Sequence, residues 1–375
     1  MAASGAGRRP ESERRRRNRS RYRAQASAAS DRAAHVIHRA ADRLSRSVAT
    51  TPAARGTVTG TGAAGARGAV VITGTSSGIG RACAIGLADA GFHVFAGVRK
   101  DADGEALRHA TSGTLTPIFL DVTDPVAVQA AAEEVARTVG RDGIAGLVNN
   151  AGVGVTWPME AIPTDLLRRQ YDINVFGQVM VIQAFMPLVR LAAGRIINIG
   201  SIGDRLTMPF GGALTSSKWA FASITEALRL ELRPWGIHVV LIEPASIHTE
   251  AVDKMQADAD QTLAQLEDIQ RERYADAYRS MTRSALARER TGSSPTVVAT
   301  SVIHTLTTKK PKTRYLVGKH ARALAFIARW APDPLFDQIR VRMFGLPREF
   351  GAMHAEDTTL LSRLNEPPLR QGQQR

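Results

Sequence analysis

The sequence predicts an α/β protein whose core is a doubly wound, mostly parallel sheet of seven strands in the order 3-2-1-4-5-6-7. From Ala69 onward, short apolar runs alternate with helical stretches, which is typical of β-α-β units. A glycine-rich turn joins the first apolar run to the first helix, as in doubly wound sheets. The 375 residues, 44% of them hydrophobic, are also enough to bury one large core.

Seven short apolar runs are predicted to be strands, and five longer stretches carry a helical pattern. The predicted strands are residues 69–73, 93–97, 114–120, 144–149, 195–200, 238–243 and 313–317. The predicted helices lie near residues 78–90, 125–139, 164–192, 215–233 and 295–308. Right-handed crossovers between parallel strands lead to the strand order given above.

Most of the net charge of +14 lies at the N-terminus, where residues 1–66 hold 14 Arg against 4 acidic residues. With few large apolar side chains, this segment is predicted to be a disordered, arginine-rich tail. A transit peptide, translated upstream sequence, or an electrostatic arm for nucleic acid or an anionic membrane are alternatives. The rest of the chain is nearly balanced in charge, so nucleic-acid binding is not expected.

The single cysteine, Cys83, lies in an apolar helical stretch and has no internal disulfide partner. It is therefore interpreted as a small buried side chain in a reducing compartment. No run of 18 uncharged apolar residues and no apolar signal core is visible. We therefore expect a cytoplasmic protein, and we expect no metal site.

Residues 70–80 read VVITGTSSGIG, which is a strand, a glycine turn and the start of a helix. Glycines are needed where the backbone turns tightly and approaches a pyrophosphate, whose charge meets free N–H groups at the helix N-terminus. The TGxxxGxG spacing in this context predicts a dinucleotide site. Its residues are predicted to be Gly74, Ser76, Ser77, Gly78, Ile79 and Gly80.

A second motif, Asn149-Asn150-Ala151-Gly152, ends the fourth predicted strand. Together with the glycine turn it resembles the motifs of the short-chain dehydrogenase/reductase family, and the resemblance covers about residues 67–345. It implies a Rossmann fold that binds a nicotinamide dinucleotide. The further cofactor contacts that the resemblance implies are Asp121, Val122, Asn150, Ala151, Gly152, Lys218 and Thr249.

The choice of cofactor is set at the end of the second strand, where a carboxylate would bind a ribose 2′-OH and repel a 2′-phosphate. This sequence has Val98 at that position, followed by Arg99 and Lys100. Because a guanidinium can pair with a phosphate through two hydrogen bonds, NADP is favoured over NAD.

The family resemblance implies a catalytic tetrad of Asn, Ser, Tyr and Lys. Asn174, Ser201 and Lys218 match the first, second and fourth members. Leu214, four residues before Lys218 and 13 after Ser201, stands at the position of the tyrosine. Leucine has no proton to donate to an alkoxide, so proton transfer is expected to be impaired or to follow another route.

Two further segments bear on the substrate. Residues 247–290 exceed an ordinary loop and are predicted to be a helical lid, whose apolar side chains suggest an apolar ligand. The chain is most similar to the hydroxysteroid and retinol dehydrogenase branch in residues 210–220 and 227–244. Ala245 replaces a glycine that this family usually has, and is expected to disturb the loop if its φ is positive.

The last apolar segments, 324–330 and 334–339, are predicted to be short helices with basic flanks, followed by a flexible tail over 346–375. They suit the substrate pocket, a homo-oligomer contact or a peripheral membrane contact. Two functions remain open at this point. One is an NADP-dependent oxidoreductase for an apolar alcohol or ketone. The other is a catalytically silent NADP-binding sensor or partner subunit.

Overall fold

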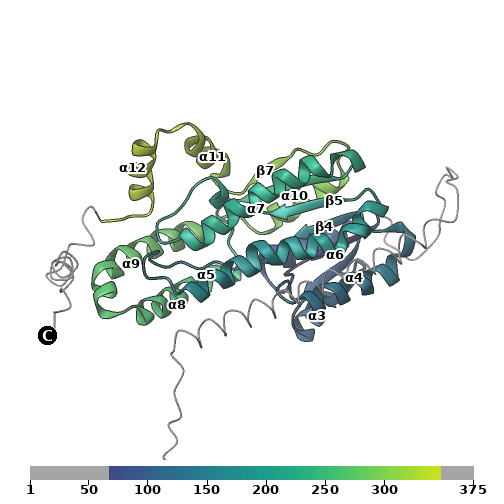
Figure 1. Cartoon of the computed structure of the whole chain (residues 1–375), viewed down its shortest axis with the longest axis horizontal. Helices are drawn as coiled ribbons and strands as arrows, with labels where there is room; N and C mark the ends of the chain where they lie inside the picture. The colour runs from purple at the N-terminus through teal and green to yellow at the C-terminus, as the bar shows by residue number, and fades with distance from the viewer. Residues whose placement is uncertain (1–66, 348–375) are drawn as a thin grey trace, which may run out of the picture. The chain divides into compact units, whose positions relative to one another are not determined.

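A seven-stranded parallel sheet in the order β3-β2-β1-β4-β5-β6-β7 forms the centre of the molecule (Figure 1). The structure, a computed structural model, describes residues 67–347. The strands are β1 (Ala69–Ile72), β2 (His93–Val98), β3 (Leu115–Phe119), β4 (Gly146–Asn149), β5 (Arg195–Ile199), β6 (His238–Pro244) and β7 (Arg314–Val317). The predicted fold class and strand order are confirmed, and each predicted strand is present within two residues of its predicted ends.

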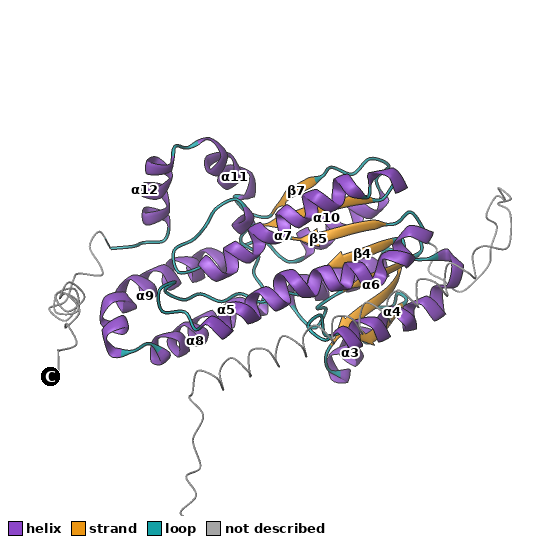
Figure 2. Ribbon diagram, in the orientation of Figure 1, coloured by secondary structure: helices purple, strands orange, loops and turns teal. Residues whose placement is uncertain are grey.

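Helices cover both faces of the sheet (Figure 2). They are α2 (Gly78–Asp89), α3 (Asp101–Arg108), α4 (Pro125–Val139), α5 (Thr164–Tyr171), α6 (Gly177–Leu191), α7 (Gly212–Glu231), α8 (Glu250–Gln265), α9 (Asp268–Arg290), α10 (Thr296–Thr307), α11 (Ala321–Trp330) and α12 (Asp333–Met343). Side chains of α4, α6 and α7 pack on one face of the sheet, and those of α2, α3 and α10 pack on the other. Cys83 lies in the second layer, and burial raises the pKa of its thiol to about 12, so the thiol stays protonated.

The predicted helix 164–192 is not one regular helix. A π-helical turn, η2 (Asp172–Phe176), separates α5 from α6. Its wider winding leaves the carbonyl of Ile173 to accept a hydrogen bond of 3.1 Å from Nε2 of Gln178. Within residues 67–347, the segment Thr164–Leu191 is long and apolar enough to cross a membrane by length and composition alone, yet half of its apolar window is buried inside the protein.

The region predicted to be a lid consists of two helices, α8 and α9, which lie side by side beyond the ends of the strands (Figure 1). They enclose a third apolar cluster around the fully buried Tyr278, which includes Trp157, Leu263, Met281 and Phe344. The chain breaks between the helices at Leu266 and Glu267, so the apolar spacing expected across this region belongs to two helices.

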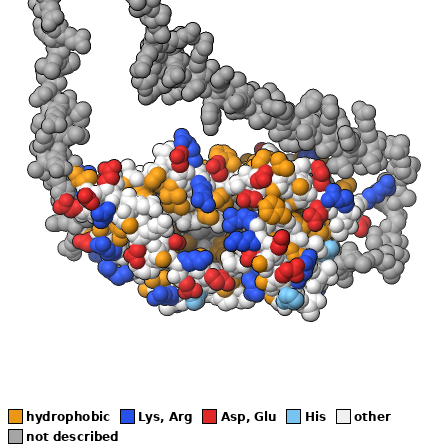
Figure 3. All heavy atoms as spheres, turned by 90° about the horizontal axis from the view of Figure 1, so that it is seen from below, with side chains coloured by type: hydrophobic (Ala, Val, Ile, Leu, Met, Phe, Trp, Pro, Cys, Tyr) orange, Lys and Arg blue, Asp and Glu red, His pale blue; other side chains and the backbone are white. Residues whose placement is uncertain are grey.

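Three features of the sequence prediction need separate mention. Helix α3 was not among the predicted helices. Only Gly104 and Leu107 are buried in it, so it has little apolar pattern in the sequence. The predicted tail 1–66 and residues 348–375 of the predicted C-terminal tail lie outside the described residues. On the face shown in Figure 3, Lys and Arg side chains are interspersed with Asp, Glu and apolar side chains, as the nearly balanced charge predicts.

We expect Phe185→Ala to lower the free energy of unfolding by about 3–5 kcal/mol, because the ring is completely buried between α6 and the sheet and its loss leaves a cavity. Denaturant unfolding measures this change. The matched control is Phe119→Ala, at a ring that is 56% exposed, which should change stability by less than about 0.5 kcal/mol. Equal effects of the two substitutions would contradict the assigned core.

Candidate active site

The glycine turn between β1 and α2 is tied to the end of β4 by a set of hydrogen bonds. Oγ1 of Thr73 accepts the backbone N–H groups of Asn150 and Ala151, each at 2.9 Å. The side-chain amide of Asn150 donates back to the carbonyls of Thr73 and Gly74 at 3.0 and 2.9 Å. The TGxxxGxG and NNAG motifs are therefore two sides of one crevice at the carboxyl ends of adjacent strands.

Two positions in this crevice require glycine. Gly74 has φ +68°, and a Cβ there would lie 2.8 Å from Cα of Ala151. A Cβ on Gly80 would collide with the carbonyl oxygen of Gly74 and with the side-chain amide of Asn150. The start of α2 can approach β4 this closely only without side chains at these two positions.

The N-terminus of α2 already holds an anionic group. The carboxylate of Glu250 accepts the backbone N–H of Gly78 at 2.9 Å, and the neighbouring Thr249 lies against the same glycine. The side chain of Ser77, the N-cap, makes no capping hydrogen bond, and both Ser76 and Ser77 are exposed. The carboxylate stands where a cofactor phosphate is expected, which indicates that this turn fits a diphosphate.

Five other predicted cofactor contacts differ in how far they are buried. Val122 is buried in the core beside α6, so it has only its backbone atoms to offer a cofactor. Ile79 is half-buried, and its side chain packs in part against the core beside α2. Arg99 and Lys100 are exposed at the end of β2. Burial alone raises the pKa of Asp121, but hydrogen bonds from Thr123 and the charge of Arg99 outweigh it and lower this pKa.

Asn174 and Lys218 meet on either side of Gly152. A Cβ on Gly152 would lie 3.3 Å from Oδ1 of Asn174 and 3.8 Å from Nζ of Lys218. Asn174 accepts the N–H of Val153 at 2.9 Å and donates to its carbonyl at 3.0 Å. Three of the predicted site residues, from three different elements, are thus brought together.

Lys218 extends from α7 toward the end of β5, where its ammonium donates to the carbonyl of Ile199 at 3.0 Å. Burial lowers the pKa of Lys218 to about 8, against the pull of the acidic Asp204. Ser201 caps the short 3-10 helix η3 (Ile202–Asp204), and its Oγ accepts the N–H of Gly203 at 3.0 Å. Since Oγ is the acceptor in that bond, the hydroxyl proton of Ser201 is available to a substrate oxygen.

Leu214 lies on α7 one turn before Lys218, with its side chain 3.4 Å from the position of a Cβ on Gly154. The hydroxyl groups that follow it are used within the helix. Thr215, Ser216 and Ser217 donate to the carbonyls of residues 211, 213 and 214 at 2.9, 3.2 and 2.7 Å. Oγ of Ser217 also accepts from Nδ2 of Asn174 at 3.1 Å and from Nε2 of Gln170 at 3.4 Å, so this hydroxyl contacts the site asparagine while its own proton is donated within the helix.

The concern about Ala245 does not apply to the structure. The positive φ in this loop, 48°, is at Ser246, while Ala245 is not among the described residues with positive φ. The N–H of Ala245 donates to the carbonyl of Val317 at 2.9 Å, which fixes the loop to β7. The methyl group of Ala245 therefore strains no left-handed backbone here.

Sequence reasoning missed three buried polar residues of the site. Gln170, one turn before Asn174, binds both the N–H of Val155 and the carbonyl of Val153. Asp204 and Glu243 are buried behind Ser201. The acid within the apolar strand 238–244 was a visible signal for Glu243, since buried acids are paired, whereas Gln170 and Asp204 had no such signal. Within residues 67–347, no group of three His, Cys, Asp or Glu side chains could hold a metal ion.

The fold and the site define a dinucleotide-binding α/β protein with a serine and a lysine at the mouth of the crevice. The family profile described as "short chain dehydrogenase" matches residues 68–260. The chain belongs to the short-chain dehydrogenase/reductase family, and it is an oxidoreductase of that family.

Three curated relatives are similar over most of their length. Human dehydrogenase/reductase SDR family member 9 (Homo sapiens) is 34% identical over 259 residues, which are 68% of this chain and 81% of that protein. NADPH-dependent 3-dehydrocapnine reductase of Ornithobacterium rhinotracheale is 34% identical, with 72% and 94% covered. Retinol dehydrogenase 5 of Mus musculus is 32% identical, with 72% and 86% covered. These relatives support the predicted branch of the family.

Solved structures support the fold. A short-chain dehydrogenase from Streptomyces avermitilis has a TM-score of 0.59 at 24% identity and covers 80% of this chain and 99% of its own. One from Burkholderia cenocepacia in complex with NADP has a TM-score of 0.54 at 23% identity, with 72% and 97% covered. One from Burkholderia phymatum in complex with NAD has a TM-score of 0.59 at 24% identity, with 72% and 95% covered.

We expect Gly80→Ala to abolish saturable NADPH binding, because the added methyl group would separate the start of α2 from Gly74 and Asn150. Titration followed by nicotinamide fluorescence measures the binding. The control is Gly86→Ala on the same helix, where a Cβ would lie 3.5 Å from Ala299, an ordinary contact, so affinity should change less than about twofold. Undiminished binding by folded Gly80→Ala would contradict the assigned cofactor turn.

Proposed function

We propose that the protein is an NADP-dependent oxidoreductase for an apolar alcohol or ketone, with a non-standard proton route. The observation that carries the proposal is that Asn174 and Lys218 both lie beside Gly152, next to the glycine turn, and that Lys218 binds the carbonyl of Ile199, two residues before Ser201. Two cations, Arg99 and Lys100, are exposed at the end of β2. They support the choice of NADP because they can pair with the negative charge of a 2′-phosphate. The name of the NADPH-dependent relative supports the same choice.

Each retained residue has a task in this reaction. A bound nicotinamide supplies or accepts the hydride. Lys218, whose ammonium now binds the carbonyl of Ile199, would hold the nicotinamide ribose, and Ser201, whose hydroxyl proton is available, would donate a hydrogen bond that polarises the substrate carbonyl. Asn174 fixes the loop at Val153 that borders the reacting groups. Positioning and polarisation remain without the tyrosine.

The missing tyrosine sets the expected rate. General acid catalysis contributes about 10²–10⁴-fold, so Leu214 at this position makes a slow enzyme. Ser201, or a water held by Lys218 and Asn174, is the proposed proton donor to the alkoxide. Leu214 also favours the second candidate, a catalytically silent NADP-binding sensor or partner subunit.

The apolar cluster under the lid supports an apolar substrate. Trp157, Met281 and Tyr278 belong to this cluster, and Met208 and Phe210 from the segment after Ser201 pack against it. The names of the retinol and 17-beta-hydroxysteroid dehydrogenases among the relatives support the same substrate class.

The exposed aromatic side chains of α11, at 66% and 67%, support a homo-oligomer contact as a further proposal.

We expect Leu214→Tyr to raise kcat by about 10²–10⁴-fold on a reducible hydrophobic ketone, because it restores a proton donor one turn before Lys218. Stopped assays of NADPH consumption on a ketone panel measure this change, and Lys218→Ala should abolish the wild-type turnover. The control is Leu230→Tyr on the exposed side of α7, which should leave kcat unchanged. NADPH binding with turnover in Leu214→Tyr alone would reject the enzyme and establish the silent protein.

We expect Arg99→Ala to weaken NADPH binding by about tenfold to a hundredfold, since hydrogen bonds to a charged group are worth about 1.5–3 kcal/mol. NADH binding, which lacks the 2′-phosphate, should change less than about threefold. Fluorescence titration with both coenzymes measures the ratio. Arg108→Ala, which removes an exposed arginine of α3 paired with Glu105, is the control. Equal losses for the two coenzymes would refute the role of Arg99 in cofactor choice.

A further inference from the structure

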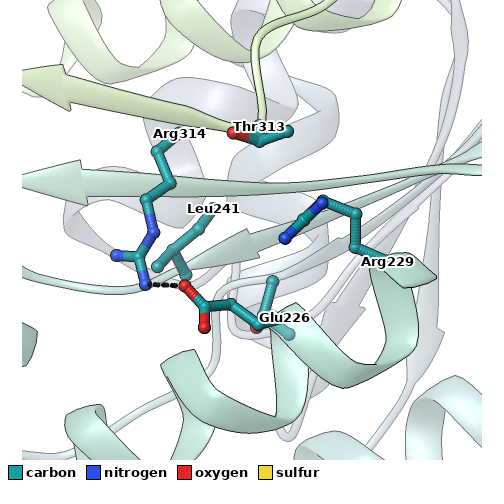
Figure 4. Close-up of a pocket in the computed structure, with 6 residues that line it drawn as sticks. Glu226, Arg229, Leu241, Thr313 and Arg314 are labelled. Atoms are coloured by element: carbon teal, nitrogen blue, oxygen red, sulfur yellow. Dashed lines mark hydrogen bonds and ion pairs between the residues drawn. The ribbon is translucent and has the colours of Figure 1, made fainter.

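Two buried carboxyl groups, Asp204 and Glu243, lie together behind the catalytic serine. Both side chains are completely buried. Arg205 binds Glu243 with two hydrogen bonds of 2.5 and 3.0 Å, and Arg314 donates to the same carboxylate at 2.8 Å. Arg314 also pairs with the more exposed Glu226 at 2.9 Å (Figure 4). The carboxylate of Glu243 is thus paired with two guanidinium groups.

Asp204 has a different set of partners. Its Oδ2 accepts the backbone N–H of Ser201 at 3.4 Å, which completes a reciprocal capping box with the serine hydroxyl. Gly200 makes room for this carboxyl group, since a Cβ there would lie 2.6 Å from Oδ2. Oδ1 makes no hydrogen bond in the described part of the chain, and the nearest guanidinium nitrogen, of Arg314, is 3.7 Å away.

The unequal partners place one proton on this pair. When two carboxyl groups are buried side by side, ionisation of one disfavours ionisation of the other. Burial, followed by the neighbouring Glu243, raises the pKa of Asp204 to about 8. Burial alone would raise the pKa of Glu243 too, but Arg205, Asp204 and Arg314 outweigh it and keep this pKa low. Of the two groups, Asp204 is therefore the one that keeps a proton to higher pH.

Asp204 is also electrostatically linked to Lys218. The negative form of Asp204 favours the ammonium form of Lys218, while burial of the ammonium disfavours it. The charged and titratable groups that face this pair are Glu243 on β6, Arg314 on β7, Arg205 after η3, and Lys218 and Glu226 on α7. As pH rises through about 8, the proton leaves Asp204 in the same range in which Lys218 begins to lose its own.

We propose that Asp204 is a positioning residue that orients Ser201 through its backbone N–H and, by releasing a proton, keeps Lys218 charged as the medium becomes alkaline. The inference rests on the proposed function, because the charge of Lys218 matters through the cofactor that it holds. Asp204 is buried and acts through these two residues.

The test is the pH dependence of NADPH affinity, followed by nicotinamide fluorescence with the full chain between pH 6 and 10. In the wild type, affinity falls as Lys218 loses its proton. In Asp204→Asn, no negative charge can form, so Lys218 loses its proton earlier. The midpoint should move down by about half a pH unit or more, which is about a threefold weaker affinity at pH 9.

A second variant has the opposite charge effect. In Glu243→Gln, Asp204 lacks its carboxylate neighbour and ionises at lower pH, so the midpoint should stay at or above that of the wild type. Damage to packing alone would move both variants in the same direction. The control is Glu226→Gln, at the exposed end of the same network, which should leave the profile unchanged. If one of the two buried variants fails to fold, the direction in which the midpoint moves in the other variant still tests the inference.

Three results would overturn the inference. One is an Asp204→Asn profile that coincides with that of the wild type. Another is a fall of the midpoint in Glu243→Gln. The third, an absence of saturable NADPH binding by the folded wild type, would overturn the proposed function as well, and it is distinguished from the first two by the wild-type titration alone.

Discussion

The structure depends on the close contact between the glycine turn after β1 and the end of β4. Thr73 and Asn150 exchange four hydrogen bonds with the backbone of the two segments, and the contact is possible only because Gly74 and Gly80 carry no side chain. This contact places the N-terminus of α2, where the N–H of Gly78 now binds the carboxylate of Glu250, next to the end of β4. It also carries the loop at Gly152 to Asn174 and Lys218. Cofactor binding and the arrangement of the reacting groups thus share one constraint.

The substitution at Leu214 is accommodated without other disturbance of the site. The side chain lies near the backbone at Gly154, and the hydroxyl groups after it bind carbonyls of their own helix. Ser201 and Lys218 keep the partners that orient them. The change therefore removes a proton donor from a crevice whose other predicted catalytic residues are present, and this explains why we expect proton transfer to be slow or to follow another route.

Prediction from the sequence succeeded where the determinants are local. The strand runs, the glycine turn and the helices that begin after it follow from periodicity and spacing, and the structure confirms their order. It was less complete for 164–192, where a π-helical turn interrupts a continuous apolar pattern at Asn174. It also predicted backbone strain at Ala245, whereas the positive φ of this loop is at Ser246. In both cases contacts with distant segments set the backbone, and these contacts leave no local pattern.

By itself the sequence determined the parallel sheet, the position of the dinucleotide turn and the absence of a tyrosine four residues before Lys218, because each is read from residues close together in the chain. Only the tertiary structure decided which charged side chains interact with one another. Asp204 and Glu243 are 39 residues apart in the sequence, and Arg314 lies on the last strand. Folding brings these three side chains within hydrogen-bonding or ion-pairing distance. The protonation of such groups depends on burial and on neighbours in space, which no spacing in the sequence reveals.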